Sequence, residues 1–124
     1  MTAPNIVDVT TIIGKTQTIA LSTTGETVLV SNAASSNKVF KINVIQVANV
    51  DLSSACDATV KVHSAAAGAG TGFALVSTIS VPADSTLVAL DKSTALYLEE
   101  DRSITVTASA VDDLEVIVSY EEIS

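Results

Sequence analysis

The chain has 124 residues, with 14 acidic and 6 basic side chains and a formal net charge of −8. Binding to nucleic acid or to an anionic membrane requires clustered Lys and Arg, so this balance argues against both functions. Hydrophobic residues make up 48% of the sequence but aromatic residues only 3%, so the core must be built from Val, Ile, Leu and Ala. The β-branched members of this set, together with Thr, favour strands over helices. The basic residues never cluster: they are Lys15, Lys38, Lys41, Lys61, Lys92 and Arg102.

The first residues, MTAPNIVDVTT, lack the basic region and apolar run of a signal peptide. No apolar run approaches the roughly 20 residues of a membrane span. Cys56 is the single cysteine, so an intrachain disulfide cannot form. We interpret it as a small core residue rather than a reactive thiol. We therefore expect a soluble protein that is synthesised in a reducing cytoplasm.

Short apolar–polar alternations follow one another along the chain, separated by turn residues. Residues 1–5 are predicted to form a flexible arm, because Pro4 cannot donate to a strand ladder. Gly14 and Lys15 are predicted to separate the first two strands, and Asp112 and Asp113 to mark a hairpin between the last two. The predicted strands are 6–13, 16–21, 26–31, 38–50, 57–64, 73–81, 85–90, 95–98, 103–110 and 114–122.

The longest predicted strand, 38–50, alternates cleanly at its ends but is apolar on both faces in its middle. Ile45 and Val47 fall on the face that should be polar. Either a second layer or a neighbouring subunit covers that face, or a β-bulge shifts the register within the strand. The sequence leaves both interpretations open.

The predicted strand 57–64 leads into a segment rich in Ala and Gly, 65–72 (AAAGAGTG). We predict a flexible hairpin tip there, because such small side chains bury little surface. A phosphate-binding loop is excluded by the missing Gly-Lys-Ser/Thr ending and following helix. In the strand itself we expect Ala58, Val60 and Val62 to face the core, and Thr59, Lys61 and His63 to face solvent.

These predictions indicate an all-β protein with one domain, 6–124, after the short arm. We expect a single antiparallel β-sandwich of eight to ten short strands, of the jelly-roll or Ig-like type. A closed barrel is the less favoured alternative.

The sequence offers few groups for chemistry, and we predict no enzyme and no catalytic, cofactor-binding or metal-binding residue. His63, the only histidine, is interpreted as a solvated surface residue, and one His with one Cys is too few for a metal site of that type. A glycosidase needs two carboxylates in different environments, whereas turn carboxylates should all be solvated and alike. Calcium bound by two acidic turns is a minor alternative, and otherwise acidic turns keep strand edges soluble. The carboxylates considered are Glu99, Glu100, Asp101, Asp112, Asp113, Glu121 and Glu122.

A longer segment, 31–51 (SNAASSNKVFKINVIQVANVD), and three short ones, 82–87 (PADSTL), 97–100 (YLEE) and 119–123 (SYEEI), carry a family likeness. They resemble a family of small virion structural proteins of tailed phages, especially phages of marine cyanobacteria. The chain departs from that family at Asp101 and Arg102, where the family has Gly-Asp. Its 65–72 segment is also longer than expected.

The resemblance implies a non-enzymatic structural protein of the virion, synthesised in the host cytoplasm. The resemblance does not say which part of the particle, and our first expectation is a capsid decoration (cement) protein that binds other virion proteins, such as the major capsid or neck and tail proteins. It also implies a homo-oligomer, with a trimer as one option. One alternative is a neck, tail or fibre-associated structural protein. Another is a carbohydrate-binding module on an attachment fibre, suggested by exposed Asp, Asn and Thr in loops but opposed by the absence of Trp and the scarcity of Tyr.

Overall fold

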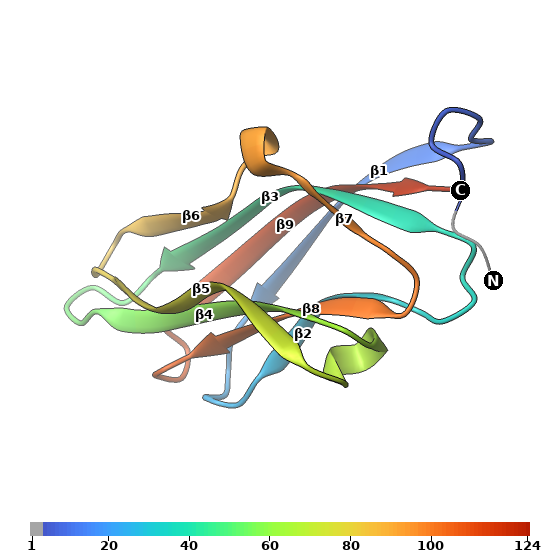
Figure 1. Ribbon diagram of the computed structural model, residues 1–124. Helices are drawn as coiled ribbons and strands as arrows, with labels where there is room; N and C mark the ends of the chain where they lie inside the picture. Colours follow the sequence, from blue (N-terminus) through green and yellow to red (C-terminus); the bar gives the residue numbers. More distant parts are fainter. Residues whose placement is uncertain (1–3) are drawn as a thin grey trace.

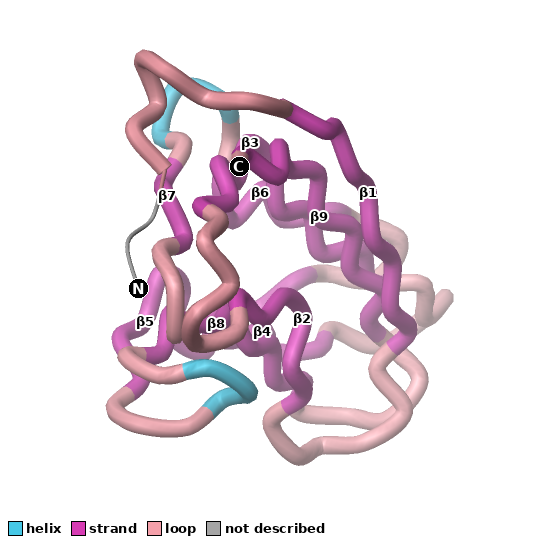
Figure 2. The backbone as a smooth tube through the Cα atoms, turned by 90° about the vertical axis from the view of Figure 1, so that its right-hand side faces the viewer, coloured by secondary structure: helices cyan, strands magenta, loops and turns pink. Residues whose placement is uncertain are grey.

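The computed structural model describes residues 4–124, which fold into two β-sheets packed face to face (Figures 1 and 2). The all-β sandwich predicted from the sequence is confirmed. The elements are β1 (Ile12–Ala20), β2 (Thr27–Asn32), β3 (Val39–Asn49), β4 (Cys56–His63), the 3-10 turn η1 (Ala66–Gly68), β5 (Gly72–Val81), β6 (Thr86–Leu90), the 3-10 turn η2 (Lys92–Thr94), β7 (Leu96–Leu98), β8 (Arg102–Ala108) and β9 (Leu114–Ile123).

The strand order identifies the sandwich as a jelly roll rather than an Ig-like fold. Sheet A has the order β1-β9-β3-β6, with β7 also paired to β3, and sheet B has the order β2-β8-β4-β5. All pairs are antiparallel, and they are nested: β1 with β9, β2 with β8, β3 with β6 and β7, and β4 with β5. Such nesting is how a jelly roll wraps a long antiparallel ribbon into two sheets.

Most connections cross from one sheet to the other, and this corrects one sequence prediction. The turn at Asp112, whose φ is 62°, joins β8 of sheet B to β9 of sheet A, so it is not a hairpin. The consecutive strands β4 and β5 do pair with each other. Turn residues indicate where a strand ends, but they carry no information on which sheet the next strand joins.

The first strand is also corrected. β1 runs without a break through Gly14 and Lys15, and the predicted strand over 6–13 is wrong for residues 6–11. That stretch forms turns instead, with the Asp8 amide donating to the Asn5 carbonyl at 2.9 Å. A Cβ at Gly14 would meet no atom within 4 Å, so neither crowding nor a turn requires glycine there. Residues 1–3 of the predicted arm lie outside the described residues.

The middle of β3 is apolar on both faces because the strand contains a bulge. Its register against β9 shifts between Ile42 and Val44. After the shift Ile45 and Val47 turn into the core, where both are 0% exposed, and Gln46 turns outward. The bulge interpretation is therefore correct, and these two side chains need no neighbouring subunit to cover them.

Two buried asparagines connect the sheets, one at the end of β3 and the other at the end of β2. Asn49, at the end of β3, donates to the Val81 carbonyl of sheet B at 2.9 Å. Asn32, at the end of β2, donates to the Leu98 carbonyl of sheet A at 3.0 Å. Both amides are nearly inaccessible to solvent, so their hydrogen bonds satisfy carbonyls that water cannot reach.

Candidate functional site

His63 points outward from sheet B as predicted, but it is buried, which corrects the expectation of a solvated side chain. It pairs with Ser103 on the outer face, and only 5% of its surface is exposed. The cover is the 65–72 segment, which folds back over the sheet instead of projecting as a free hairpin tip. The Gly68 amide donates to the Ser103 hydroxyl at 2.8 Å, and the Ala67 amide to the Ser31 hydroxyl at 2.9 Å.

Beneath this segment lies a polar cluster of His63, Glu26 and Thr105. The His63 Nε2 is 2.8 Å from a Glu26 carboxylate oxygen, and its Nδ1 is 3.2 Å from the Ala69 carbonyl. The Thr105 hydroxyl donates to the same Glu26 oxygen at 2.6 Å. This hydrogen bond, followed by that of His63, lowers the pKa of Glu26 below its ordinary value.

The cluster has the residue types of a catalytic triad but not its arrangement. A triad nucleophile gives its proton to the histidine, whereas the Thr105 proton is directed to the carboxylate. Thr105 is also only 1% exposed, so a substrate could not reach it. What the cluster can do is hold the 65–72 segment against sheet B.

The two acidic turns lie at opposite ends of β8, a strand of seven residues. Such a strand is about 23 Å long, so the carboxylates of 99–101 and of 112–113 cannot share a calcium ion. Two of them serve as backbone acceptors: Glu100 for the Asn37 amide at 3.2 Å, and Asp101 for the Ala66 amide at 3.0 Å. Across residues 4–124, no three His, Cys, Asp or Glu side chains are grouped to hold a metal ion.

Glu122 was expected among solvated carboxylates, but it is buried and forms two ion pairs. Its oxygens lie 2.7 Å from Lys38 Nζ and 2.9 Å from Lys15 Nζ. Lys38 first, and Lys15 second, lower the pKa of Glu122 below its ordinary value. The sequence did carry a signal, because the alternation that buries Val118 and Tyr120 places Glu122 on the same face of β9.

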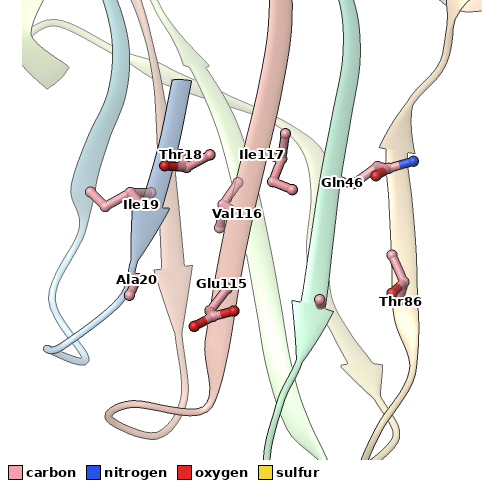
Figure 3. Close-up of a pocket in the computed structure, with 9 residues that line it drawn as sticks. Thr18, Ile19, Ala20, Gln46, Thr86, Glu115, Val116 and Ile117 are labelled. Atoms are coloured by element: carbon pink, nitrogen blue, oxygen red, sulfur yellow. The ribbon is translucent and has the colours of Figure 1, made fainter. Parts of the chain in front are cut away.

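A shallow pocket of about 420 Å³ lies on the outer face of sheet A (Figure 3). The polar groups of Thr18, Gln46, Thr86 and Glu115 surround Ile117, which is 43% exposed. These groups can hydrogen-bond a polar ligand. They include one carboxylate and no aromatic ring, so the pocket contains neither a pair of catalytic carboxylates nor a platform for stacking a sugar. The full lining is Thr18, Ile19, Ala20, Gln46, Ala48, Thr86, Glu115, Val116 and Ile117.

The core is incompletely covered on one side of the sandwich, which we call the open side. It is formed by β5, β6 and β7; in Figure 1, β5 crosses the front of the molecule with β6 and β7 above it. None of these three strands contains a charged residue. Partly buried side chains that pack on the core continue outward into exposed ones of β5. The open side comprises Phe73, Leu75, Val76, Ile79, Leu87 and Leu96.

Cys56 is 1% exposed at the start of β4, which agrees with its interpretation as a small core residue. Of the part of the chain that the structure describes, no helix is long and apolar enough to cross a membrane. No protein-family model matches the sequence, and no curated protein matches it.

Proposed function

We propose that this protein is a non-enzymatic structural component of a phage virion, and within it a capsid decoration protein. Its partners are other virion proteins, in the first place the major capsid protein, and further copies of itself. It is synthesised in the host cytoplasm and resides in the particle. The proposal assigns it no cofactor, no membrane partner and no direct contact with nucleic acid, in keeping with its net charge of −8.

The observation that carries the proposal is the position of the segments that bear the family likeness. Segment 31–51 contains β3, and segments 82–87, 97–100 and 119–123 contribute to β6, β7 and β9. All three of these strands pair with β3 in sheet A. Segments spread over about 90 residues thus meet in one sheet, and the proposal rests on the likeness carried by this sheet.

The departure from the family at residue 101 also fits this fold. Asp101 has a φ of 56°, in the left-handed region that glycine adopts without steric cost. A glycine at this position could adopt the same backbone conformation. In this chain an aspartate takes that conformation, and its carboxylate accepts a hydrogen bond from the Ala66 amide at 3.0 Å.

Two further features support a structural role. Jelly rolls are a common architecture of viral capsid domains, although lectins and enzymes share it. The apolar open side offers contact surface for another protein.

Purified particles of the phage that encodes this chain test the proposal. Quantitative mass spectrometry of washed particles should find the protein at a fixed, multiple copy number. Its absence from those particles would refute the virion assignment. A gold-labelled antibody should mark the head, and a label confined to the neck, tail or fibres would replace decoration with the alternative location.

The sheet A pocket favours a second candidate, a carbohydrate-binding module. Gln46, Glu115 and Thr18 could bond to sugar hydroxyls, but the pocket contains no aromatic ring for the sugar face. A glycan array should therefore give no signal for the wild-type protein. A signal that disappears in Gln46→Ala would support this candidate over the virion role.

A further inference from the structure

We infer that the 65–72 segment is a proton-controlled flap. It is closed over sheet B while His63 carries a proton on both ring nitrogens, and it loosens when His63 loses one of them. The inference goes beyond the proposed function and does not depend on it, because every contact involved lies within one chain. Opening of the flap gives solvent access to the hydroxyl groups of Ser103 and Thr105, which are 0% and 1% exposed in the closed structure.

The imidazole of His63 faces hydrogen-bond acceptors on both sides. Its Nδ1 lies 3.2 Å from the carbonyl oxygen of Ala69, a residue of the flap. Its Nε2 lies 2.8 Å from the Glu26 carboxylate and 3.1 Å from the Thr105 hydroxyl oxygen. Thr105 donates its own proton to Glu26, so its oxygen acts as an acceptor toward the ring. Because a carbonyl and an ionised carboxylate cannot donate, both ring nitrogens form hydrogen bonds only when both carry a proton.

A neutral imidazole has a single N–H group, so it satisfies only one of these two sides. The Glu26 carboxylate is the stronger acceptor, and a neutral His63 directs its proton there. The lone pair of Nδ1 then faces the Ala69 oxygen, and the flap loses the hydrogen bond that joins it to the ring. Loss of the proton also removes the ion pair of His63 with Glu26. Deprotonation therefore acts on the flap directly.

Water cannot replace the lost hydrogen bond while the flap is closed. A Cβ at Gly72 would lie 3.0 Å from the Cε1 atom of the His63 ring, and a Cβ at Gly68 would lie 3.3 Å from the Thr105 methyl group. The flap thus packs closely on the ring and on its neighbour. A buried polar atom without a partner is costly, so a neutral His63 favours an open flap that admits water.

Among the groups around the flap, His63 is the one that changes charge near neutral pH. The hydrogen bond from Thr105, followed by that of His63, lowers the pKa of Glu26, so this carboxylate is ionised throughout that range. The strands β2 and β5 contain no charged residue. Carboxylates, lysine and arginine titrate outside the range of about pH 5–8 in which histidine changes charge. The other charged side chains beside the flap are Lys61 of β4, Asp101 before β8 and Arg102 at its start.

Hydrogen exchange of the wild-type protein at about pH 5.5 and about pH 8 tests this inference. Dividing each rate by that of an unstructured chain at the same pH gives a protection factor that reports opening alone. Closure is favoured while the second proton is bound and is lost as pH rises. The protection factors of the flap amides 66–69 should therefore fall at least about fivefold from the lower to the higher pH. Those of 116–118 in β9 should change less than about twofold.

His63→Gln is the test variant, because glutamine keeps a donor and an acceptor but cannot take up a proton. The pH dependence of flap protection should disappear in it. The control Lys61→Gln removes a neighbouring charge that does not titrate in this range, and it should retain the dependence. If circular dichroism shows that His63→Gln is unfolded, nitrogen NMR of the wild-type imidazole decides, and its signals need no assignment because His63 is the only histidine. Both ring nitrogens should be protonated at about pH 5.5 and one at about pH 8.

Three results would overturn the inference. They are wild-type flap protection that stays constant or rises with pH, a pH dependence that survives in His63→Gln, and a His63 ring nitrogen that lacks a proton at about pH 5.5. The virion assignment is decided separately, by the composition of the particle.

Discussion

Replacement of Asn49 with leucine tests how one buried amide holds the two sheets together. The side-chain nitrogen donates to the carbonyls of Val81 and Ser54, both at 2.9 Å, and the side-chain oxygen accepts the Asp51 amide at 3.0 Å. Leucine has the same branched arrangement of side-chain heavy atoms but no polar atom, so the substitution removes these hydrogen bonds, and its bulkier methyl groups add a packing cost at this buried position.

The expected cost follows from what water can reach. The hydrogen bond to the Val81 carbonyl is buried, and leaving that acceptor without a partner costs about 1–3 kcal/mol. The other two partners lie nearer the surface, where each lost bond costs about 0.5–1.5 kcal/mol. The loss of hydrogen bonds alone should therefore lower the free energy of unfolding by about 2–6 kcal/mol. At an unfolding entropy of about 2.1 cal/mol/K per residue, this lowers the Tm by about 8–23 °C.

Urea denaturation followed by circular dichroism measures the change. Gln46→Leu is the matched control, because Gln46 is an exposed residue of the same strand and its loss should alter stability by less than about 0.5 kcal/mol. If Asn49→Leu lowers the free energy of unfolding by less than about 1 kcal/mol, and the slope of that free energy against urea concentration is unchanged, the role assigned to the amide is refuted.

Four further substitutions test other parts of the structure. The lowered pKa of Glu122 means that its ion pairs stabilise the fold above the ordinary pKa of 4.5, and that this contribution is lost as pH falls through the lowered value. Glu122→Gln should thus reduce the urea midpoint at pH 7 but not at low pH. An equal reduction at both pH values would contradict the stabilising role of the Glu122 ion pairs. Gly70 has a φ of 71°, and a Cβ there would lie 2.4 Å from the Ser64 hydroxyl oxygen, so Gly70→Ala should lower the free energy of unfolding by about 1–3 kcal/mol. The control Gly14→Ala, at a position with no atom within 4 Å of a Cβ, should leave the free energy of unfolding unchanged or raise it by up to about 1 kcal/mol in the same urea denaturation experiment. His63→Ala should speed amide hydrogen exchange in the 65–72 segment at least about tenfold, and unchanged exchange would show that the polar cluster does not hold it.

The strands from residue 26 onward could be predicted to within two residues at either end, because alternation reports burial directly. The first strand could not. Ile6 and Val7 imitate a strand pattern but are 51% and 90% exposed, so their apolar character does not reflect the core. In β3 the pattern of a bulge and that of a strand covered on both faces are the same, and only the pairing with β9 distinguishes them.

The polar cluster of His63, Glu26 and Thr105 was harder to predict, because its burial depends on contacts between residues distant in sequence. His63 is covered by a segment that lacks large side chains and is held by hydrogen bonds to Ser31, Asp101 and Ser103. Nothing local to 65–72 reports those partners. Glu122 was predictable from the period of its own strand, and the expectation that terminal carboxylates are solvated outweighed that signal.

The most direct test of the virion assignment is an electron cryo-microscopy map of the intact particle. We predict density that fits this jelly roll at many symmetry-related positions on the outer surface of the head. A map in which the sandwich is absent would contradict the virion role, and one in which it occupies only the neck, tail or fibres would contradict decoration.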